Sequence, residues 1–158
     1  MKYWPNGQLD GSRAAAIIFA MAKTSPRIAV VDDDLSVLKA LSRLLRARAF
    51  DARTFASARE FLAALRDGRP DGRPECLIVD LQMPDMSGLE LLQHLARSGA
   101  HIPTIIITAH GDMGLRERCE SAGAAAFLLK PLQDTALFAA IDVARRAATD
   151  RSGGPSSA

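Results

Sequence analysis

The chain from residue 27 to residue 148 alternates between short apolar runs and longer stretches whose apolar residues recur every three or four positions. Most of the short runs are rich in Ile and Val without polar alternation, which predicts strands that are buried on both faces of a sheet. One run, FDARTF, alternates weakly, as a less buried strand does. The five predicted strands are RIAVV (27–31), FDARTF (50–55), CLIVD (76–80), IPTIIIT (102–108) and AAFLLKP (125–131).

The longer stretches have the period of amphipathic helices. Ser57 with Glu60 three positions later forms a capping box at the start of one stretch, and Gly123 is a C-terminal signal for another. The predicted helices are LSVLKALSRLLRA (35–47), SAREFLAAL (57–65), GLELLQHLARSG (88–99), DMGLRERCESAG (112–123) and QDTALFAAIDVARRAA (133–148). Strands that alternate with helices favour right-handed crossovers, so the predicted fold class is α/β, a doubly wound five-stranded parallel sheet.

Two terminal segments lie outside this pattern. We expect residues 1–26 to be an N-terminal extension that is either disordered or the product of a mis-assigned start, with Met21 as the true first residue. The run AAAIIFAMA (14–22) resembles a weak signal peptide, but it is short and rich in alanine. The tail 149–158 is rich in Ser, Gly and Pro, which predicts disorder. One domain, 27–148, remains between them.

Composition and charge narrow the class of protein. The 158 residues are 48% hydrophobic and 24% charged, as in a globular domain, and no apolar run approaches the roughly 20 residues of a membrane span. The net charge of +2 is spread along the chain, so we expect no direct binding to nucleic acid. Cys76 and Cys119 are expected to be free, buried thiols, as in the reducing cytoplasm.

Polar residues stand at the carboxyl ends of four predicted strands. In open α/β sheets ligands bind outside these ends, so the residues are expected to share one rim. They are Asp32, Asp33 and Asp34 after the first strand, Asp80 at the end of the third, Thr108 at the end of the fourth, and Lys130 with Pro131 at the end of the fifth.

The chemistry of this rim points to phosphoryl transfer. Clustered carboxylates repel one another, and a hard divalent cation such as Mg²⁺, which prefers oxygen ligands, relieves the repulsion. A carboxylate beside Mg²⁺ can attack phosphorus to form an aspartyl phosphate. A metal ion, an ammonium and a hydroxyl then balance the negative charge on the phosphoryl oxygens in the transition state.

Four segments carry a family resemblance: IAVVDDD, LIVDLQMPDMSGLELL, IIITAH and AAFLLKP. They resemble the signature segments of bacterial two-component response-regulator receiver domains, and VDDD and MPDMSG are most similar to FixJ-type regulators. The resemblance covers residues 27–148 and implies a flavodoxin-like fold with strand order 2-1-3-4-5. It suggests a stand-alone receiver, because only a short polar tail follows residue 148.

The resemblance implies a role for each rim residue. Asp80 is the phospho-acceptor. Asp33 ligates Mg²⁺ directly, Asp32 does so directly or through water, and the backbone carbonyl of Gln82 completes the protein ligands. Thr108 hydrogen-bonds a phosphoryl oxygen after activation.

Further roles concern the fifth strand and the loop after the acceptor. Lys130 pairs with the phosphoryl group or Asp80, and the Lys130–Pro131 bond is expected to be cis. Phe127 matches the switch aromatic, whose inward rotation follows the movement of Thr108. Gly88 and Pro84 shape the loop after the acceptor.

The function that the resemblance implies is a signalling switch. A histidine kinase or histidine phosphotransfer protein donates the phosphoryl group, and the surface of 112–123, 125–131 and 133–148 changes to signal to an unidentified output protein or to form a phospho-dependent homodimer. The protein is not an enzyme in the usual sense, although it catalyses its own phosphoryl transfer and slow autodephosphorylation. No membrane partner is expected.

Other interpretations remain open at this level. An aspartate-nucleophile hydrolase would want a second acid two residues after Asp80, where the chain has Gln82. A DNA-binding regulator would need a helix-turn-helix pattern, and none follows Ala148, although the chain could be part of such a protein. A receiver that acts only as a scaffold would not need the full set of acids, Thr108 and Lys130.

Single residues also have plain structural interpretations. The acidic run is a solvated loop in most proteins, with Asp34 as a helix N-cap, and Phe127 in an apolar strand is ordinarily core. His94 and His101 are expected at the surface. His110, two residues after Thr108, is either an exposed loop residue or, together with Gln82, a residue that tunes the lifetime of the phosphoryl group.

Overall fold

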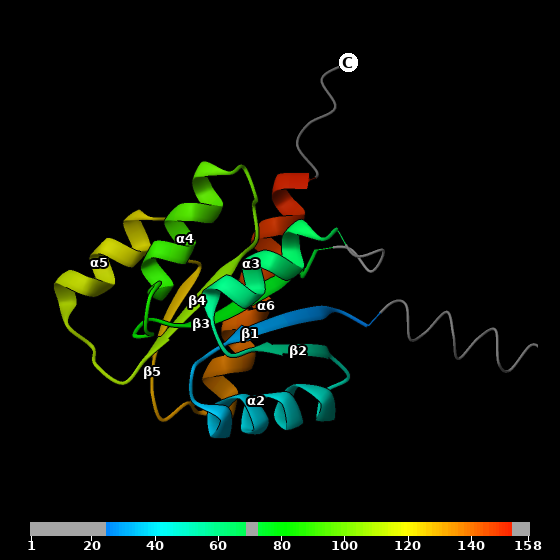
Figure 1. The fold of residues 1–158 in the computed structure, drawn as a ribbon. Helices are drawn as coiled ribbons and strands as arrows, with labels where there is room; N and C mark the ends of the chain where they lie inside the picture. The colour runs from blue at the N-terminus through cyan, green and yellow to red at the C-terminus, as the bar shows by residue number, and fades with distance from the viewer. Residues whose placement is uncertain (1–24, 69–72, 153–158) are drawn as a thin grey trace, which may run out of the picture.

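The computed structural model describes residues 25–68 and 73–152. The predicted N-terminal extension up to residue 24, including Met21 and the apolar run 14–22, lies outside the described residues, and so does the end of the tail. Within the described part, strands and helices alternate strictly along the chain (Figure 1). They are β1 (Arg27–Val31), α2 (Leu35–Ala47), β2 (Asp51–Phe55), α3 (Ala58–Arg66), β3 (Cys76–Asp80), α4 (Gly88–Arg97), β4 (Thr104–Thr108), α5 (Met113–Ser121), β5 (Ala126–Leu129) and α6 (Asp134–Ser152).

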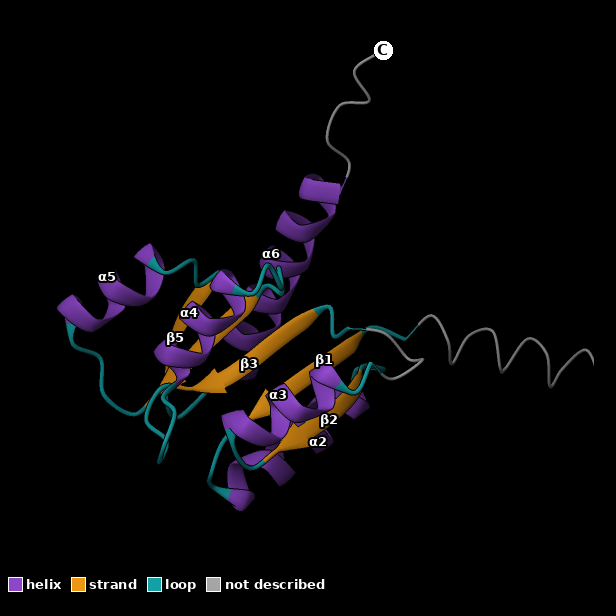
Figure 2. Ribbon diagram, turned by 45° about the horizontal axis from the view of Figure 1, so that its top comes forward, coloured by secondary structure: helices purple, strands orange, loops and turns teal. Residues whose placement is uncertain are grey.

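The strands form one parallel sheet in the order β2-β1-β3-β4-β5. This confirms the doubly wound α/β fold and the strand order 2-1-3-4-5. The sheet is sandwiched between α3, α4 and α5 on one face and α2 and α6 on the other, as the turned view shows (Figure 2). No helix among residues 25–68 and 73–152 has the length and apolar character needed to cross a bilayer.

Side-chain alternation in the strands explains both layers. In β1, Ala29 and Val31 pack with the helices of one face, while Ile28 and Val30 pack with those of the other. Every residue of the inner strands β3 and β4 is buried, which is why their sequences are apolar except at Asp80, Thr104 and Thr108. At the sheet edges β2 and β5 are only partly covered, and this accounts for the weak alternation of FDARTF.

The helix starts follow the predicted caps. The Asp34 carboxylate accepts the N–H of Ser36, so Asp34 is the N-cap of α2. Ser57 Oγ accepts the N–H of Glu60 at the start of α3, and the Glu60 carboxylate accepts the N–H of Ala56 rather than that of Ser57. The bonds to Ser36 and Glu60 satisfy backbone donors that the first turn of a helix leaves free, and the bond to Ala56 ties the residue before the N-cap to α3.

The end of the last helix differs from the prediction. Helix α6 continues to Ser152, whereas the sequence predicted a helix to residue 148 and a disordered tail from residue 149. The residues that follow 148 contain no Gly or Pro before Gly153, so nothing in them stops the helix. The Thr149 hydroxyl donates to the Arg145 carbonyl one turn earlier. Of the predicted tail, the first four residues, 149–152, are therefore helical.

Candidate functional site

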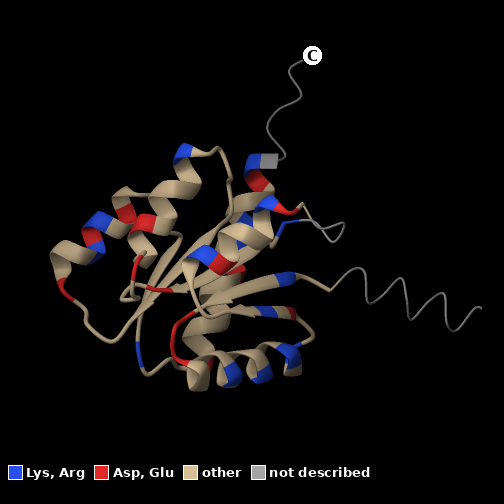
Figure 3. Cartoon of the chain, viewed as in Figure 1, with Lys and Arg blue, Asp and Glu red and all other residues tan. Residues whose placement is uncertain are grey.

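The carboxyl ends of β1, β3, β4 and β5 meet at one edge of the sheet, so residues from distant parts of the chain come together there. In Figure 2 the arrowheads of β1 and β3 point to this edge, and in Figure 3 acidic residues lie at the turns that follow these strands. The predicted rim therefore exists as a structural unit.

Three acids form the centre of the rim. Asp32, Asp33 and Asp80 each offer a carboxylate oxygen, and these oxygens lie within 4.8 Å of one another. Asp32 and Asp80 are buried and Asp33 is exposed. Oxygen ligands opposite each other on Mg²⁺ are about 4.2 Å apart, because each bond is about 2.1 Å long. The three carboxylates thus lie close enough together to converge on one hard divalent cation.

Lys130 bridges the two buried acids. Its Nζ lies 2.9 Å from Asp32 Oδ2 and 3.4 Å from Asp80 Oδ1. The other oxygen of Asp32 accepts the backbone N–H of Asp34 at 2.9 Å. Both oxygens of Asp32 are therefore engaged, while Asp80 is held more loosely.

The pKa shifts of Asp80 and Lys130 follow from this arrangement. Burial raises the pKa of Asp80 above its ordinary value and the charge of Asp32 raises it further, against the opposing effect of Lys130 and of a hydrogen bond from the Gln82 backbone. For Lys130, burial lowers the pKa, but the hydrogen bond to Asp32 and the charges of both acids outweigh it, so the pKa is raised. The raised pKa of Lys130 keeps its ammonium charged beside the two buried acids.

Thr108 is buried at the end of β4, next to the acids, but its hydroxyl is directed to the following loop. Oγ1 donates to the His110 carbonyl at 3.3 Å and accepts the His110 N–H at 3.2 Å. The structure thus places Thr108 at the rim, with the hydroxyl hydrogen already used by the backbone.

The loop after Asp80 folds back on the acceptor. The N–H of Gly88 donates to the Leu81 carbonyl at 3.0 Å, and the N–H of Met86 donates to the Pro84 carbonyl at 2.8 Å. A Cβ on Gly88 would lie 2.6 Å from the Asp80 carbonyl oxygen. Only glycine permits α4 to start so close to the acceptor.

Phe127 lies away from the acids, in the core. It is 9% exposed and packs in the cluster beneath α3, α4 and α5, with the Arg116 guanidinium 6.0 Å from its ring centroid. The ring is therefore already inward while the Thr108 hydroxyl still binds His110. The switch role of Phe127, in which the aromatic moves in after Thr108, stays a prediction.

The remaining predicted positions are distributed around the rim. The Lys130–Pro131 peptide is cis, as the resemblance implies. Gln82 and His110 are exposed on loops at the mouth of the site, whereas His94 and His101 are exposed elsewhere. Cys76 and Cys119 are free and buried. One contact at the rim escaped sequence reasoning: Leu129 packs against Gly111, and no motif signals such a contact.

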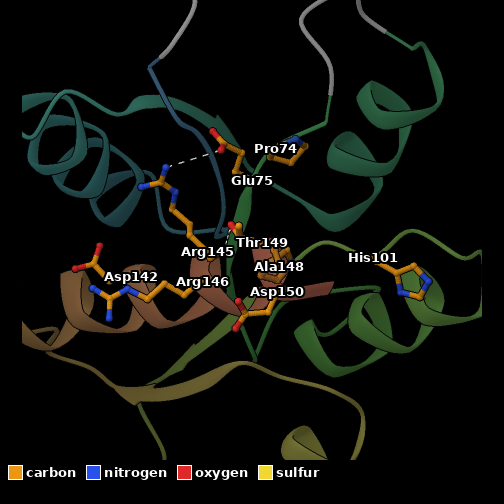
Figure 4. Close-up of a pocket in the computed structure, with 10 residues that line it drawn as sticks. Pro74, Glu75, His101, Asp142, Arg145, Arg146, Ala148, Thr149 and Asp150 are labelled. Atoms are coloured by element: carbon orange, nitrogen blue, oxygen red, sulfur yellow. Dashed lines mark hydrogen bonds and ion pairs between the residues drawn. The ribbon is translucent and has the colours of Figure 1, made fainter. Parts of the chain in front are cut away.

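A second cleft lies at the opposite edge of the sheet, and of the predicted positions it contains only His101 (Figure 4). It has a volume of about 660 Å³ and mixed charge, with Arg145 and Arg146 beside Asp142 and Asp150. Arg145 pairs with Glu75 at 3.8 Å, the dashed line in Figure 4. The cleft shares no residue with the acidic rim.

The strand order and the acidic pocket at the carboxyl edge define the class of CheY-like receiver domains. The chain belongs to the response regulator receiver domain family, whose model matches residues 28–142. Acceptance of a phosphoryl group by an aspartate is general to this family.

Individual relatives agree with the FixJ-type resemblance. Over 119 residues the chain is 40% identical to the transcriptional regulatory protein FixJ of Rhizobium meliloti (strain 1021). The matched region covers 75% of this chain and 56% of FixJ. It is 39% identical over 120 residues to nodulation protein W of Bradyrhizobium diazoefficiens, covering 76% and 51% of the two chains. The crystal structure of FixJ-N superposes with a TM-score of 0.69 at 39% identity, over 78% of this chain and 95% of that one. The chain spans about half the length of the curated relatives that it matches.

Proposed function

We propose that this receiver accepts a phosphoryl group on Asp80 from a histidine kinase or a histidine phosphotransfer protein, with Mg²⁺ held by Asp32, Asp33, Asp80 and the Gln82 carbonyl. The observation that carries the proposal is the meeting of Asp80 with two further acids and Lys130 at one edge of the sheet. When bound, Mg²⁺ supplies positive charge that screens the acids and polarises a phosphoryl oxygen.

The hydrogen bonds of the site favour Asp80 as the nucleophile over its neighbours. Asp32 is fully buried, with one oxygen bound to Lys130 and the other to the Asp34 N–H. Asp33 is exposed at the flank of the site. Asp80 is buried within reach of both acids and only loosely bound to Lys130, at 3.4 Å.

The transfer forms one bond and breaks one. A carboxylate oxygen of Asp80 attacks phosphorus, the P–N bond to the donor histidine breaks, and the imidazole nitrogen keeps the electron pair. Lys130 neutralises negative charge on the phosphoryl group. The Thr108 hydroxyl donates a hydrogen bond to a phosphoryl oxygen after its bond to the His110 carbonyl has broken. In this sense the protein catalyses its own phosphorylation.

Incubation with acetyl phosphate and Mg²⁺ followed by intact mass tests the proposal. We expect the mass of one phosphoryl group to be added to wild type and to Asp85→Asn, a control that removes an exposed acid from the same loop. Asp80→Asn is expected to gain nothing, and EDTA is expected to abolish the gain in wild type. An unchanged gain in Asp80→Asn would reject Asp80 as the acceptor.

We assign slow autodephosphorylation to water that passes the exposed side chains of Gln82 and His110 at the mouth of the site. Gln82→Ala and His110→Ala are expected to change the half-life of the phosphorylated form, whereas His94→Ala on the outside of α4 is not. Equal half-lives in all of these variants would rule out the tuning role.

The output surface is assigned to α5, β5 and α6. Three exposed apolar side chains support this choice, because Met113, Leu129 and Val143 lie one on each element. Such residues are available to an output protein or a second copy of the chain. Light scattering with and without phosphorylation distinguishes the two: a dimer that forms only when Asp80 is phosphorylated supports self-association. The proposed donors and the free buried thiols fit a cytoplasmic location.

A further inference from the structure

The loop between β4 and α5, residues 109–112, holds the Thr108 hydroxyl away from Asp80. The hydroxyl donates to the His110 carbonyl and accepts from the His110 N–H. A hydroxyl has one hydrogen, so it cannot donate to His110 and to a phosphoryl oxygen at the same time. The bond that the Thr108 hydroxyl donates to this loop must therefore break when Thr108 turns toward a phosphoryl group on Asp80.

Leu129 packs directly against this loop. A Cβ on Gly111 would lie 2.5 Å from Leu129 Cδ2 and 3.1 Å from Cδ1, so the leucine fills the space beside the glycine backbone. Leu129 pairs with Thr108 in the sheet and immediately precedes Lys130. Its side chain is nevertheless 54% exposed. The loop is thus one of the surfaces that cover its buried part.

We propose that Leu129 is a positioning residue, which acts through the 109–112 loop to keep Thr108 bound to His110 until Asp80 is phosphorylated. The proposal rests on the proposed function of Asp80. The chemistry of transfer needs neither a leucine at 129 nor a glycine at 111, so the close contact between them is not a requirement of that chemistry. Removal of the leucine side chain removes support from the resting loop and shifts the population toward the state in which Thr108 is free.

Beryllofluoride, formed from beryllium and fluoride salts as a mimic of a phosphoryl group, is the probe. It is titrated into the full chain with saturating Mg²⁺ and followed by calorimetry. We expect Leu129→Ala to bind it about fivefold more tightly than wild type. This factor corresponds to the burial free energy of part of a leucine side chain, which the resting loop loses in the variant. Leu129→Met, which keeps the length of the side chain, and Leu35→Ala, which removes an exposed leucine side chain (63%) from α2, outside the proposed output surface, are expected to bind as wild type does.

Amide hydrogen exchange provides a second readout. In Leu129→Ala the His110 N–H is expected to exchange faster, because its bond to Thr108 opens more often. Loss of a leucine that only stabilises the fold would not tighten beryllofluoride binding, so faster exchange together with tighter binding distinguishes the two roles.

The two proposals fail separately. Equal or weaker beryllofluoride binding by Leu129→Ala, beside a wild type that binds, overturns the role of Leu129 alone. A wild type that neither binds beryllofluoride nor gains mass with acetyl phosphate overturns the proposed function and the inference with it.

Discussion

Lys130 is the residue on which the resting site depends most. Its ammonium contacts two buried carboxylates, at 2.9 Å and 3.4 Å, and only 22% of its side chain is exposed. Without it, Asp32 and Asp80 would face each other across a poorly solvated pocket. Two buried like charges raise each other's pKa and destabilise the folded state.

Replacement of Lys130 by Met is therefore expected to destabilise the protein at neutral pH by about 3 kcal/mol in the absence of Mg²⁺. Denaturant unfolding measures this. The control Arg116→Met breaks an ion pair with Glu120 in which both side chains are more than half exposed, and it is expected to cost less than about 1 kcal/mol. Equal losses in the two variants would show that Lys130 does not hold the acids.

Cys76 allows a prediction of pH dependence. Burial raises the pKa of its thiol to about 12 from an ordinary value of 9.0, although the charge of Arg145 acts in the other direction. A raised thiol pKa stabilises the folded state below pH 9.0, and this contribution is lost as the pH rises toward 12. The free energy of unfolding should therefore fall more steeply between these pH values in wild type than in Cys76→Ala. Identical slopes, or rapid reaction of native Cys76 with a thiol reagent at neutral pH, would contradict the assignment.

At the scale of elements, the close start of α4 behind Asp80 links the fold to the site. The close approach of Gly88 to the Asp80 backbone fixes where the acceptor strand ends and where the helix begins. Because the neighbouring atom is a backbone carbonyl, it cannot turn away as a side chain would.

Gly88→Ala is expected to cost about 1–3 kcal/mol of stability, the usual range for overpacking, and to slow phosphorylation of Asp80 by acetyl phosphate. Gly114→Ala on α5 is the control, since the nearest neighbour of its Cβ would be a side-chain oxygen of Asp112 at 3.2 Å rather than a backbone atom at 2.6 Å. That variant should stay within about 1 kcal/mol of wild type. A fully stable Gly88→Ala that is phosphorylated at the normal rate would show that the loop adapts freely.

The elements also show what the sequence could predict. The strand ends were predictable, because apolar runs end at Asp80, Thr108 and Lys130 and parallel strands share an edge. The extension of α6 to Ser152 was missed, since the polar composition of the tail outweighed the absence of helix-breaking residues before Gly153. The hydroxyl direction of Thr108 could not be predicted either, because it depends on a loop whose backbone has no sequence signature.

The contact of Leu129 with Gly111 illustrates the same limit. Both residues lie in segments whose type the sequence predicted, but their packing depends on how β5 and the β4–α5 loop meet in space. The same holds for Phe127, whose place in the core is set by α3, α4 and α5 together. Local pattern predicts elements, whereas side-chain partners follow from tertiary contacts.

At the scale of the whole molecule, the acidic pocket exists only when the sheet is assembled. Asp33 and Asp80 belong to the ends of neighbouring strands that are far apart in the chain, so the unfolded protein does not hold their carboxylates together. A cation that binds this pocket must stabilise the folded state by mass action.

We expect Mg²⁺ at 100 times its dissociation constant to raise the free energy of unfolding by about 2.7 kcal/mol. Asp33→Asn should lose most of this increase and little stability without Mg²⁺, because Asp33 is exposed. Sodium chloride at matched ionic strength is the control for screening. An equal gain in the variant would show that Mg²⁺ acts elsewhere on the protein.

The central claim, that Asp80 itself forms the acyl phosphate, is tested most directly by reductive trapping. The protein is treated with acetyl phosphate and Mg²⁺ and then with borodeuteride, which reduces an aspartyl phosphate to deuterated homoserine with release of phosphate. Peptide mass spectrometry then locates the modified residue. The account predicts homoserine at position 80 and at no other aspartate; homoserine at position 32 or 33, or none at all in protein that has gained the phosphoryl mass, would contradict it.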